Sequence, residues 1–248
     1  MAATEITHLL LDFFGTIVDY SPSRTEQDYS TSYGVLCRLG ATLSYDSFLT
    51  LGDAIFGEYD ARCAADLSEF SMQEPSLVIM EQAIGRAPTP DETIAFVEAY
   101  LADWNSAVLY PAGMSSLLEN LRQQFRLAVV SNTHSTALVP DHLEAMGVAD
   151  LFDAVVLSVE VGHRKPHPAI YRAALDRLGI TAGYALFVGD TYAADYEGPR
   201  QQGIRALLID PRNCAPVPPA DRLGSLFDLP RTLVPSGQES PRAGSLTE

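Results

Sequence analysis

The segment HLLLDFFGTIVDY, residues 8–20, places a carboxylate at the end of an apolar run and then turns at a glycine. An apolar run of this kind predicts a buried strand, and Gly15 marks the point where the chain leaves it. A carboxylate at the end of a buried strand is costly unless it is paired, binds a metal ion or acts as a nucleophile. Asp12 is therefore the first candidate catalytic residue.

The chain contains 16 basic residues, and Lys165 is its single lysine. A solubilising surface charge could have been an arginine, like all the others. An ammonium group is a compact point charge, which can approach a carboxylate or phosphoryl oxygen in a way that a guanidinium cannot. We therefore expect Lys165 to belong to a site.

Further polar residues follow other apolar runs of the chain. They are Ser131, Asn132, Thr133, Asp190 and Asp195. Each motif alone is common, because serine–asparagine caps and glycine–aspartate turns occur for structural reasons. In a parallel sheet, however, the carboxyl ends of the strands lie at one edge, and sites form there. Three carboxylates gathered at such an edge suit Mg²⁺, which prefers hard oxygen ligands.

The elements that must position these residues alternate between strand and helix. Short apolar runs predict strands at residues 6–12, 126–131, 152–157, 184–188 and 205–209. Helices are predicted at residues 113–124, 136–146, 168–178 and 192–202. Strands that are apolar throughout and alternate with helices predict an α/β fold whose parallel sheet is covered on both faces.

One connection is far too long for a simple crossover. Residues 21–109 predict helices at 24–39, 45–64, 71–84 and 90–104, and we interpret them as an inserted helical domain. Beyond residue 210 the chain becomes rich in Pro, Ser and Gly, which predicts a loose tail with little packing.

The motifs D-x-x-G-T, S-N-T, K-P-x-P and G-D-x-x-x-x-D, in this order and spacing, resemble those of the haloacid dehalogenase superfamily. The resemblance covers residues 6–210. It implies a Rossmann-like core with a five-stranded parallel sheet and a helical cap between the first two motifs. The expected domains are a core at 1–20 and 110–212, a cap at 21–109 and a flexible tail at 213–248.

The resemblance also implies a role for each motif residue. Asp12 would be the nucleophile, and Lys165 would neutralise Asp12 and the substrate anion. Ser131 would hydrogen-bond the transferred group, with the catalytic Asn132 amide nearby. Mg²⁺ would bind Asp12, Asp190 and the main-chain oxygen of Phe14, while Asp195 would orient Lys165 or a metal-bound water. Substrate contacts are expected from Phe14, Gly15, Thr16 and Thr133.

Phe14 departs from the pattern of the family's phosphatases. They carry a second aspartate there, which protonates the leaving alcohol and then deprotonates the attacking water. Loss of a general acid–base group costs about 10²–10⁴-fold in rate, so unactivated esters should react slowly. The family's dehalogenases carry an aromatic residue at this position because a halide leaves without a proton. Phosphonate-cleaving members use a cap lysine, but residues 21–109 contain none.

Three interpretations remain open. Asp190 favours a Mg²⁺-dependent phosphatase with a non-standard acid–base group, since the resemblance implies that dehalogenases need no metal and lack this acid. Phe14 favours a 2-haloacid dehalogenase-like hydrolase with an apolar halide pocket; Tyr171 suits both classes. The third interpretation is a catalytically weak binding protein, and the presence of all the motif acids and Lys165 counts against it.

Some other residues have a simpler interpretation. His134, His163 and His167 could supply the missing proton transfer, and His134 is the best placed, although loop histidines usually face solvent. Phe96, Tyr100 and Trp104 fall at helical spacing and are expected in the core of the cap.

Composition limits the partners. The net charge of −16 argues against nucleic acid and anionic membranes, which require basic surfaces. No apolar stretch reaches the roughly 18–20 residues of a membrane span, and no secretory signal is recognisable. Three cysteines without metal-ligand spacing favour free thiols in the cytoplasm. We therefore expect a cytoplasmic monomer or homodimer that acts on a small molecule.

Overall fold

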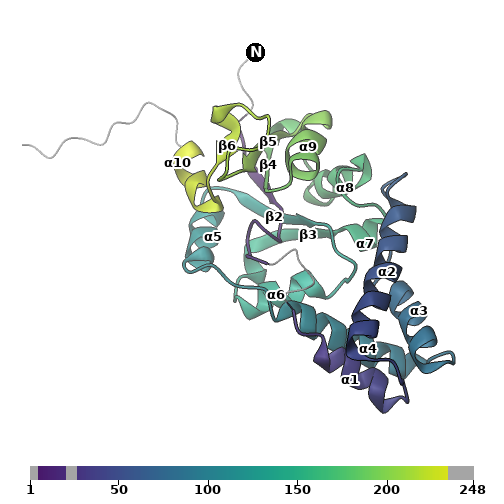
Figure 1. Ribbon diagram of the computed structural model, residues 1–248. Helices are drawn as coiled ribbons and strands as arrows, with labels where there is room; N and C mark the ends of the chain where they lie inside the picture. Colours follow the sequence, from purple (N-terminus) through teal and green to yellow (C-terminus); the bar gives the residue numbers. More distant parts are fainter. Residues whose placement is uncertain (1–4, 21–26, 234–248) are drawn as a thin grey trace, which may run out of the picture.

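The computed structural model describes residues 5–20 and 27–233 of the chain. A single parallel sheet forms its centre, with strand order β3-β2-β1-β4-β5-β6 (Figure 1). The strands are β1 (His8–Leu11), β2 (Arg126–Ser131), β3 (Phe152–Leu157), β4 (Ala185–Gly189), β5 (Arg205–Ile209) and β6 (Arg222–Leu223). The parallel α/β architecture is as predicted, with one strand more than the five expected.

Strand β1 lies in the middle of the sheet and is apolar on both faces. Leu10 pairs with Ala128 of β2 and with Phe187 of β4. Leu9 and Leu11 belong to one hydrophobic cluster and Leu10 to another, because successive side chains of a strand point to opposite faces.

Helices cover both faces of the sheet. The cluster that contains Leu9 is shared with α5 (Met114–Arg122), α6 (Leu138–Ala145) and α10 (Leu229–Leu233). The cluster that contains Leu10 is shared with α8 (Pro168–Leu178). The short helices α7 (Ser158–Val161) and α9 (Gly198–Gln201) complete the core.

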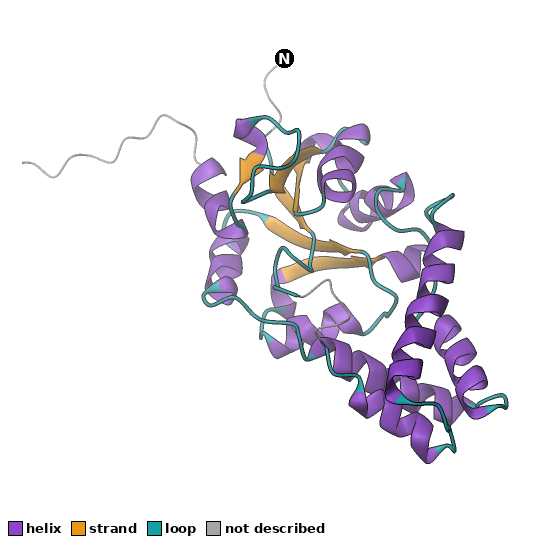
Figure 2. Ribbon diagram, viewed as in Figure 1, coloured by secondary structure: helices purple, strands orange, loops and turns teal. Residues whose placement is uncertain are grey.

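A group of helices stands apart from the sheet (Figure 2). It consists of α1 (Ser30–Arg38), α2 (Tyr45–Cys63), α3 (Gln73–Ile84) and α4 (Pro90–Asn105). These helices share a hydrophobic cluster of their own. Helix α4 begins sharply because Thr89 and Glu92 form a capping box around Pro90. We call these helices, together with the segments that connect them, the cap; the first part of the helix predicted at 24–39 lies outside the described residues.

The two connections between cap and core run side by side. Asp19 and Leu109 exchange both backbone hydrogen bonds, with N···O distances of 3.0 and 2.9 Å. This pair brings the ends of the insertion together next to the strand that carries Asp12. The domain boundaries themselves stay a prediction.

Two segments differ from the sequence-based expectation. Residues 219–233 are not a loose tail: β6 pairs with β5, and Leu223, Leu226 and Leu229 are buried in the core. Residues 234–248, the rest of the expected tail, lie outside the described residues. The single helix expected at 192–202 is instead a π-helix, Tyr192–Glu197, followed by α9.

In the described residues, no helix is long and apolar enough to cross a membrane.

Packing of the C-terminal segment predicts a clear difference between two neighbouring residues. Leu229 is fully buried, so Leu229→Ala should lower the free energy of unfolding by about 2–5 kcal/mol. Phe227 is 41% exposed, and Phe227→Ala should cost much less. Urea unfolding of both variants measures this difference. Equal unfolding midpoints would mean that the segment does not stabilise the core.

Candidate active site

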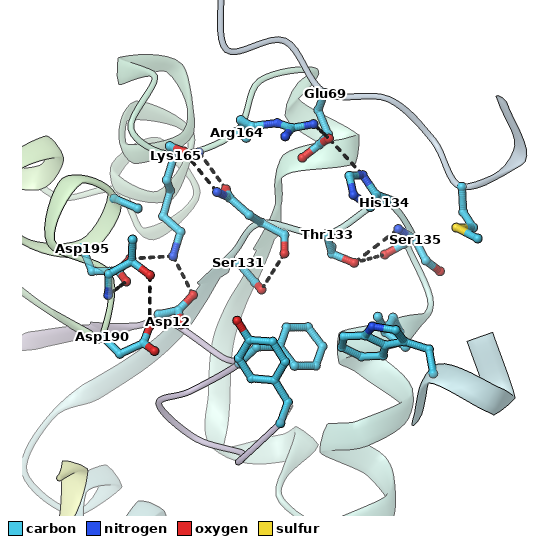
Figure 3. Close-up of a pocket in the computed structure, with 18 of the residues that line it drawn as sticks. Asp12, Glu69, Ser131, Thr133, His134, Ser135, Arg164, Lys165, Asp190 and Asp195 are labelled. Carbon is cyan, nitrogen blue, oxygen red and sulfur yellow. Dashed lines mark hydrogen bonds and ion pairs between the residues drawn. The ribbon is translucent and has the colours of Figure 1, made fainter. Parts of the chain in front are cut away.

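The Lys165 ammonium lies between two carboxylates. Its Nζ atom is 2.6 Å from Asp12 Oδ1 and 2.7 Å from Asp195 Oδ1 (Figure 3). All three side chains are buried. The only lysine of the sequence is therefore almost fully buried, and both of its ion pairs are largely shielded from water.

These charges change one another's pKa values. Burial raises the pKa of Asp12 to about 7, and Asp195 and Asp190 add to the rise while Lys165 opposes it. Burial alone would lower the pKa of Lys165, but Asp12 and Asp195 outweigh it and raise the pKa. One ammonium therefore does not fully compensate the carboxylates, and the site favours a further cation.

Backbone hydrogen bonds hold the two segments that carry Asp12 and Lys165. The backbone N–H of Asp12 donates to the Val188 carbonyl, which extends the pairing of β1 with β4. Asn132 binds the backbone of Lys165 from both sides: its Oδ1 accepts from Lys165 N at 2.7 Å, and its Nδ2 donates to Lys165 O at 3.1 Å. The Asn132 amide thus holds Lys165 in place instead of pointing freely at a substrate.

The π-helix places Asp195. Its Oδ2 atom accepts a hydrogen bond from the Thr191 backbone at 2.9 Å, while Oδ1 accepts from Lys165. A Cβ atom at Gly189 would collide with this carboxylate. Tyr171 supports the same helix by donating to the Ala194 carbonyl. A π-turn at this point agrees with the frequent occurrence of such turns at functional sites.

Three carboxylates could together hold a metal ion. One oxygen each of Asp12, Asp190 and Asp195 lie within 4.8 Å of one another, and Asp190 is the exposed member. Gly15 has φ +83°, and a Cβ atom there would overlap the Asp190 carboxylate. The turn after β1 can therefore approach Asp190 only with glycine at this position. The donors fit a hard divalent cation, which takes oxygen ligands.

A cavity of about 460 Å³ lies between this cluster and the cap. The predicted residues that line it are Asp12, Phe14, Ser131, Asn132, Thr133, Lys165, Asp190 and Asp195. Two predicted substrate contacts lie behind its wall: Thr16 donates to Asp12 Oδ2 at 3.3 Å, and Gly15 makes room for Asp190. Ser131 is buried, and the Thr133 backbone N–H donates to Ser158 Oγ at 2.8 Å.

The cavity also contains cap residues that the sequence did not reveal as functional. Glu69 is a buried carboxylate that accepts from Arg164 at 2.6 Å and from Ser158 at 2.7 Å. It also lies 3.1 Å from Nδ1 of His134, whose ring stacks on Phe70. The sequence had indicated His134 of this network as a candidate but gave no sign of its partner Glu69. His163 and His167 stack on each other and do not line the cavity.

Trp104 also differs from the expectation. Phe96 and Tyr100 are buried in the cap, as expected, but Tyr100 also lines the cavity, and so does Trp104 at the end of the same helix. Tyr20, from the loop after β1, lines it as well. Helical spacing predicts which residues share a face of the helix. It does not predict which end of that helix lies against the α/β core and its cavity.

Residues 57–209 match the model of the haloacid dehalogenase-like hydrolase family. The chain belongs to this family. This family membership is what the four motifs predicted. The matched region includes three of the four motifs, and Asp12 supplies the first at the corresponding end of β1.

Several proteins with phosphatase names are similar in sequence to this chain. A phosphoserine phosphatase of Thermus thermophilus is 33% identical over 135 residues, which are 53% of this chain and 51% of that protein. A glyceraldehyde 3-phosphate phosphatase of Methanopyrus kandleri is 31% identical over 168 residues, which are 63% and 71%. The first of these matches thus spans about half the length of the relative.

Solved structures agree over nearly the whole chain. A 2-haloacid dehalogenase of Pseudomonas syringae has a TM-score of 0.68 at 21% identity, covering 92% of this chain and 98% of that one. A HAD phosphatase of Thermococcus onnurineus has a TM-score of 0.62 at 24% identity, with the same coverage. At these identities the likeness establishes the fold, and both chemistries occur on it.

Glu69 predicts a pH-dependent stability. Burial alone would raise its pKa, but hydrogen bonds from His134 and Ser158 and the charge of Arg164 hold the pKa below its usual value. Ionised Glu69 therefore stabilises the fold at pH values above its unfolded pKa of about 4.3. This stabilisation is lost as the pH falls through the pKa of Glu69 in the folded protein. At pH 7, Glu69→Gln should lower the free energy of unfolding by about 1–3 kcal/mol.

The difference between Glu69→Gln and the wild type should be largest at pH 7 and shrink at acid pH, as the pH falls from about 4.3 through the lower pKa of folded Glu69 and the wild-type carboxyl becomes protonated as well. Glu160, in an exposed pair with Arg177, is the control, and Glu160→Gln should cost less than about 1 kcal/mol. Urea unfolding at both pH values measures the effect. An equal loss at both would assign the contribution of Glu69 to packing rather than charge.

Proposed function

We propose that this hydrolase is a Mg²⁺-dependent phosphatase that acts on a small phosphorylated metabolite through Asp12. The observation that carries the proposal is the third carboxylate, Asp190, which joins Asp12 and Asp195 beside Lys165 in one cavity. Nucleophilic attack by a carboxylate on phosphorus alone does not require a third acid, whereas a divalent cation does require further oxygen ligands. The phosphatase names of the sequence relatives support the same conclusion.

The residues of the site fit a two-step reaction. A carboxylate oxygen of Asp12 forms a bond to phosphorus while the bond from phosphorus to the leaving oxygen breaks. Water then attacks the phosphorus of the aspartyl phosphate, which releases inorganic phosphate and restores Asp12. Lys165 keeps Oδ1 of Asp12 in place and leaves Oδ2 with one longer hydrogen bond, from Thr16. The Ser131 hydroxyl, in the cavity wall, contacts the transferred group.

Bound Mg²⁺ would neutralise the phosphate and hold it against Asp12. The chain's own ligands would be carboxylate oxygens of Asp12 and Asp190 and the main-chain oxygen of Phe14. Asp195 orients Lys165, to which it is hydrogen-bonded at 2.7 Å.

Phe14 sets a limit on the leaving group. Its ring lies in the cavity and packs at 5.1 Å against Trp104, where the family's phosphatases have a carboxylate. A phenyl ring neither donates nor accepts the proton of a leaving alcohol. The site therefore suits esters whose leaving group departs unprotonated near neutral pH, such as aryl and acyl phosphates.

Phe14 also supports a second candidate function, that of a 2-haloacid dehalogenase. In that reaction an Asp12 oxygen displaces a halide from carbon, and the halide leaves without a proton into the apolar part of the cavity. Indifference to EDTA together with halide release from a 2-haloacid would favour this function over the phosphatase.

The metal requirement provides the first test. EDTA should stop hydrolysis of 4-nitrophenyl phosphate, and Mg²⁺ should restore it. Asp12→Asn should keep a native circular dichroism spectrum and lose all turnover, because an amide does not form the covalent ester at a useful rate. Turnover retained by a folded Asp12→Asn variant would contradict the assigned nucleophile.

Gly15 allows a matched control for the same test. Gly15→Ala should abolish the Mg²⁺-dependent rise in thermal stability, because the new Cβ atom displaces the Asp190 carboxylate. Gly85 has φ +72° with nothing within 4 Å of an added Cβ atom, so Gly85→Ala introduces a similar backbone strain, costing about 1 kcal/mol, without touching the site. A normal Mg²⁺ response in Gly15→Ala would contradict the metal site.

The leaving group provides a separate test. The wild type should cleave aryl and acyl phosphates far faster than alkyl or sugar phosphates. Phe14→Asp should narrow this gap, by up to about 10²–10⁴-fold less the disturbance of packing around the ring. Values of kcat/KM for a series of esters with increasing leaving-group pKa measure the dependence.

A flat dependence on leaving-group pKa would overturn the claim that the site lacks an acid–base group. The residue to examine would then be His134, which lines the cavity and whose Nδ1 is held by Glu69. Loss of alkyl phosphate hydrolysis in His134→Ala would identify it as the relay.

A further inference from the structure

Three aromatic rings gather on one side of the cavity. Phe14 and Tyr20 come from the loop after β1, and Trp104 comes from the last turn of α4 in the cap. Phe14 meets Trp104 edge to face at 5.1 Å and Tyr20 at 5.7 Å, while Tyr20 and Trp104 are 6.2 Å apart. We call these three residues the aromatic wall.

The aromatic wall lies at the edge of two hydrophobic clusters, because Phe14 packs against the cluster of the sheet and Trp104 against that of the cap. Phe13, the neighbour of Phe14, is fully buried, and so is Phe96 on the helix of Trp104. The three rings of the wall are instead only partly buried, and all three line the cavity. Met72, Leu101 and Leu138 line it too. Apolar surface that faces a cavity is stabilised by an apolar ligand group that displaces water.

The charges of the cavity lie elsewhere. Among the described residues that line it, Arg164 and Lys165 are the permanent cations, and both are already paired with carboxylates. Arg164 binds Glu69 and Asp60, and Lys165 binds Asp12 and Asp195. The described part of the cavity thus offers no unpaired lysine or arginine to a second anionic group of the substrate.

We propose that the aromatic wall is the subsite for the leaving group and that the substrate is the phosphate monoester of an uncharged aromatic alcohol. The inference rests on the proposed phosphatase function. It gives Phe14 a second role. The phenyl ring stands where the family's phosphatases have an acid, and it also provides a surface on which an aryl group can pack. An aryl oxide needs no acid to leave, so binding and chemistry select the same class of ester.

Binding can be measured without turnover because Trp104 is the only tryptophan of the chain. Phenylphosphonate, whose carbon–phosphorus bond replaces the scissile ester bond, should change the Trp104 fluorescence saturably in the presence of Mg²⁺. Methylphosphonate carries the same anionic group without the ring and is the matched control. We expect phenylphosphonate to compete with 4-nitrophenyl phosphate about tenfold more strongly than methylphosphonate.

Substitutions in the wall test the location of the subsite. Trp104→Leu and Tyr20→Leu should each reduce the preference for phenylphosphonate and raise the ratio of KM for 4-nitrophenyl phosphate to KM for acetyl phosphate, by up to about tenfold. Both esters are activated, so this ratio reports recognition of the ring and not the departure of the leaving group. Tyr184 is 45% exposed and does not line the cavity, so Tyr184→Leu should leave both values unchanged.

The possible outcomes separate this inference from the proposed function. A wild type that hydrolyses both esters but binds the two phosphonates equally would overturn the subsite and leave the phosphatase intact. Equal changes of both KM values in the folded Tyr20→Leu variant would overturn it as well. A wild type that hydrolyses neither ester yet shows the phenylphosphonate preference, lost in Tyr20→Leu, would support the subsite and refute the phosphatase.

Discussion

The rest of the structure depends on the pairing of the buried Lys165 ammonium with two carboxylates. Its hydrogen bonds to Asp12 and Asp195 are 2.6 and 2.7 Å long. Removing ions from water costs several kcal/mol for each, and only close pairing offsets this. Asp12 follows β1, Asp195 follows β4 and Lys165 follows β3. The segments that follow these three strands must therefore begin at the same edge of the sheet for the charges to meet. The register of the parallel sheet provides this alignment, and Asn132 and the π-helix refine it.

The cap meets the core through two different kinds of contact on the wall of the cavity. One is ionic: Glu69 of the cap lies among Arg164, His134 and Ser158, each adjacent or close to a motif residue. The other is aromatic, between Phe14 and Trp104. Ionic contacts require exact directions and aromatic contacts tolerate small shifts, so the first sets the position of the cap and the second adapts to it. Any movement of the cap would change both ends of the cavity together.

Most of the sheet and the cap helices could be predicted because their signals are local. Buried parallel strands are continuous apolar runs, and a capping box and a proline in the sequence indicate where a helix such as α4 begins. Strand β6 could not be predicted, because two residues show no periodicity and their stability comes from pairing with β5. The role of Glu69 was equally hidden, since its partners Ser158 and Arg164 lie 89 and 95 positions away. Trp104 shared its spacing with Phe96, and only the position of the cap distinguishes them.

The place of β1 in the sheet has a consequence for synthesis on the ribosome. This strand is synthesised before both of its partners, since it pairs on one side with residues 126–129 and on the other with residues 185–188. Its three consecutive leucines have no strand to pair with until residues 126–129 have been translated, and only one neighbouring strand until residues 185–188 have. Contacts so distant in sequence close slowly, and an unpaired apolar strand attracts other chains. The nascent chain thus exposes an unpaired apolar strand while the residues between β1 and its partners are made, and shielding such strands is a task of chaperones.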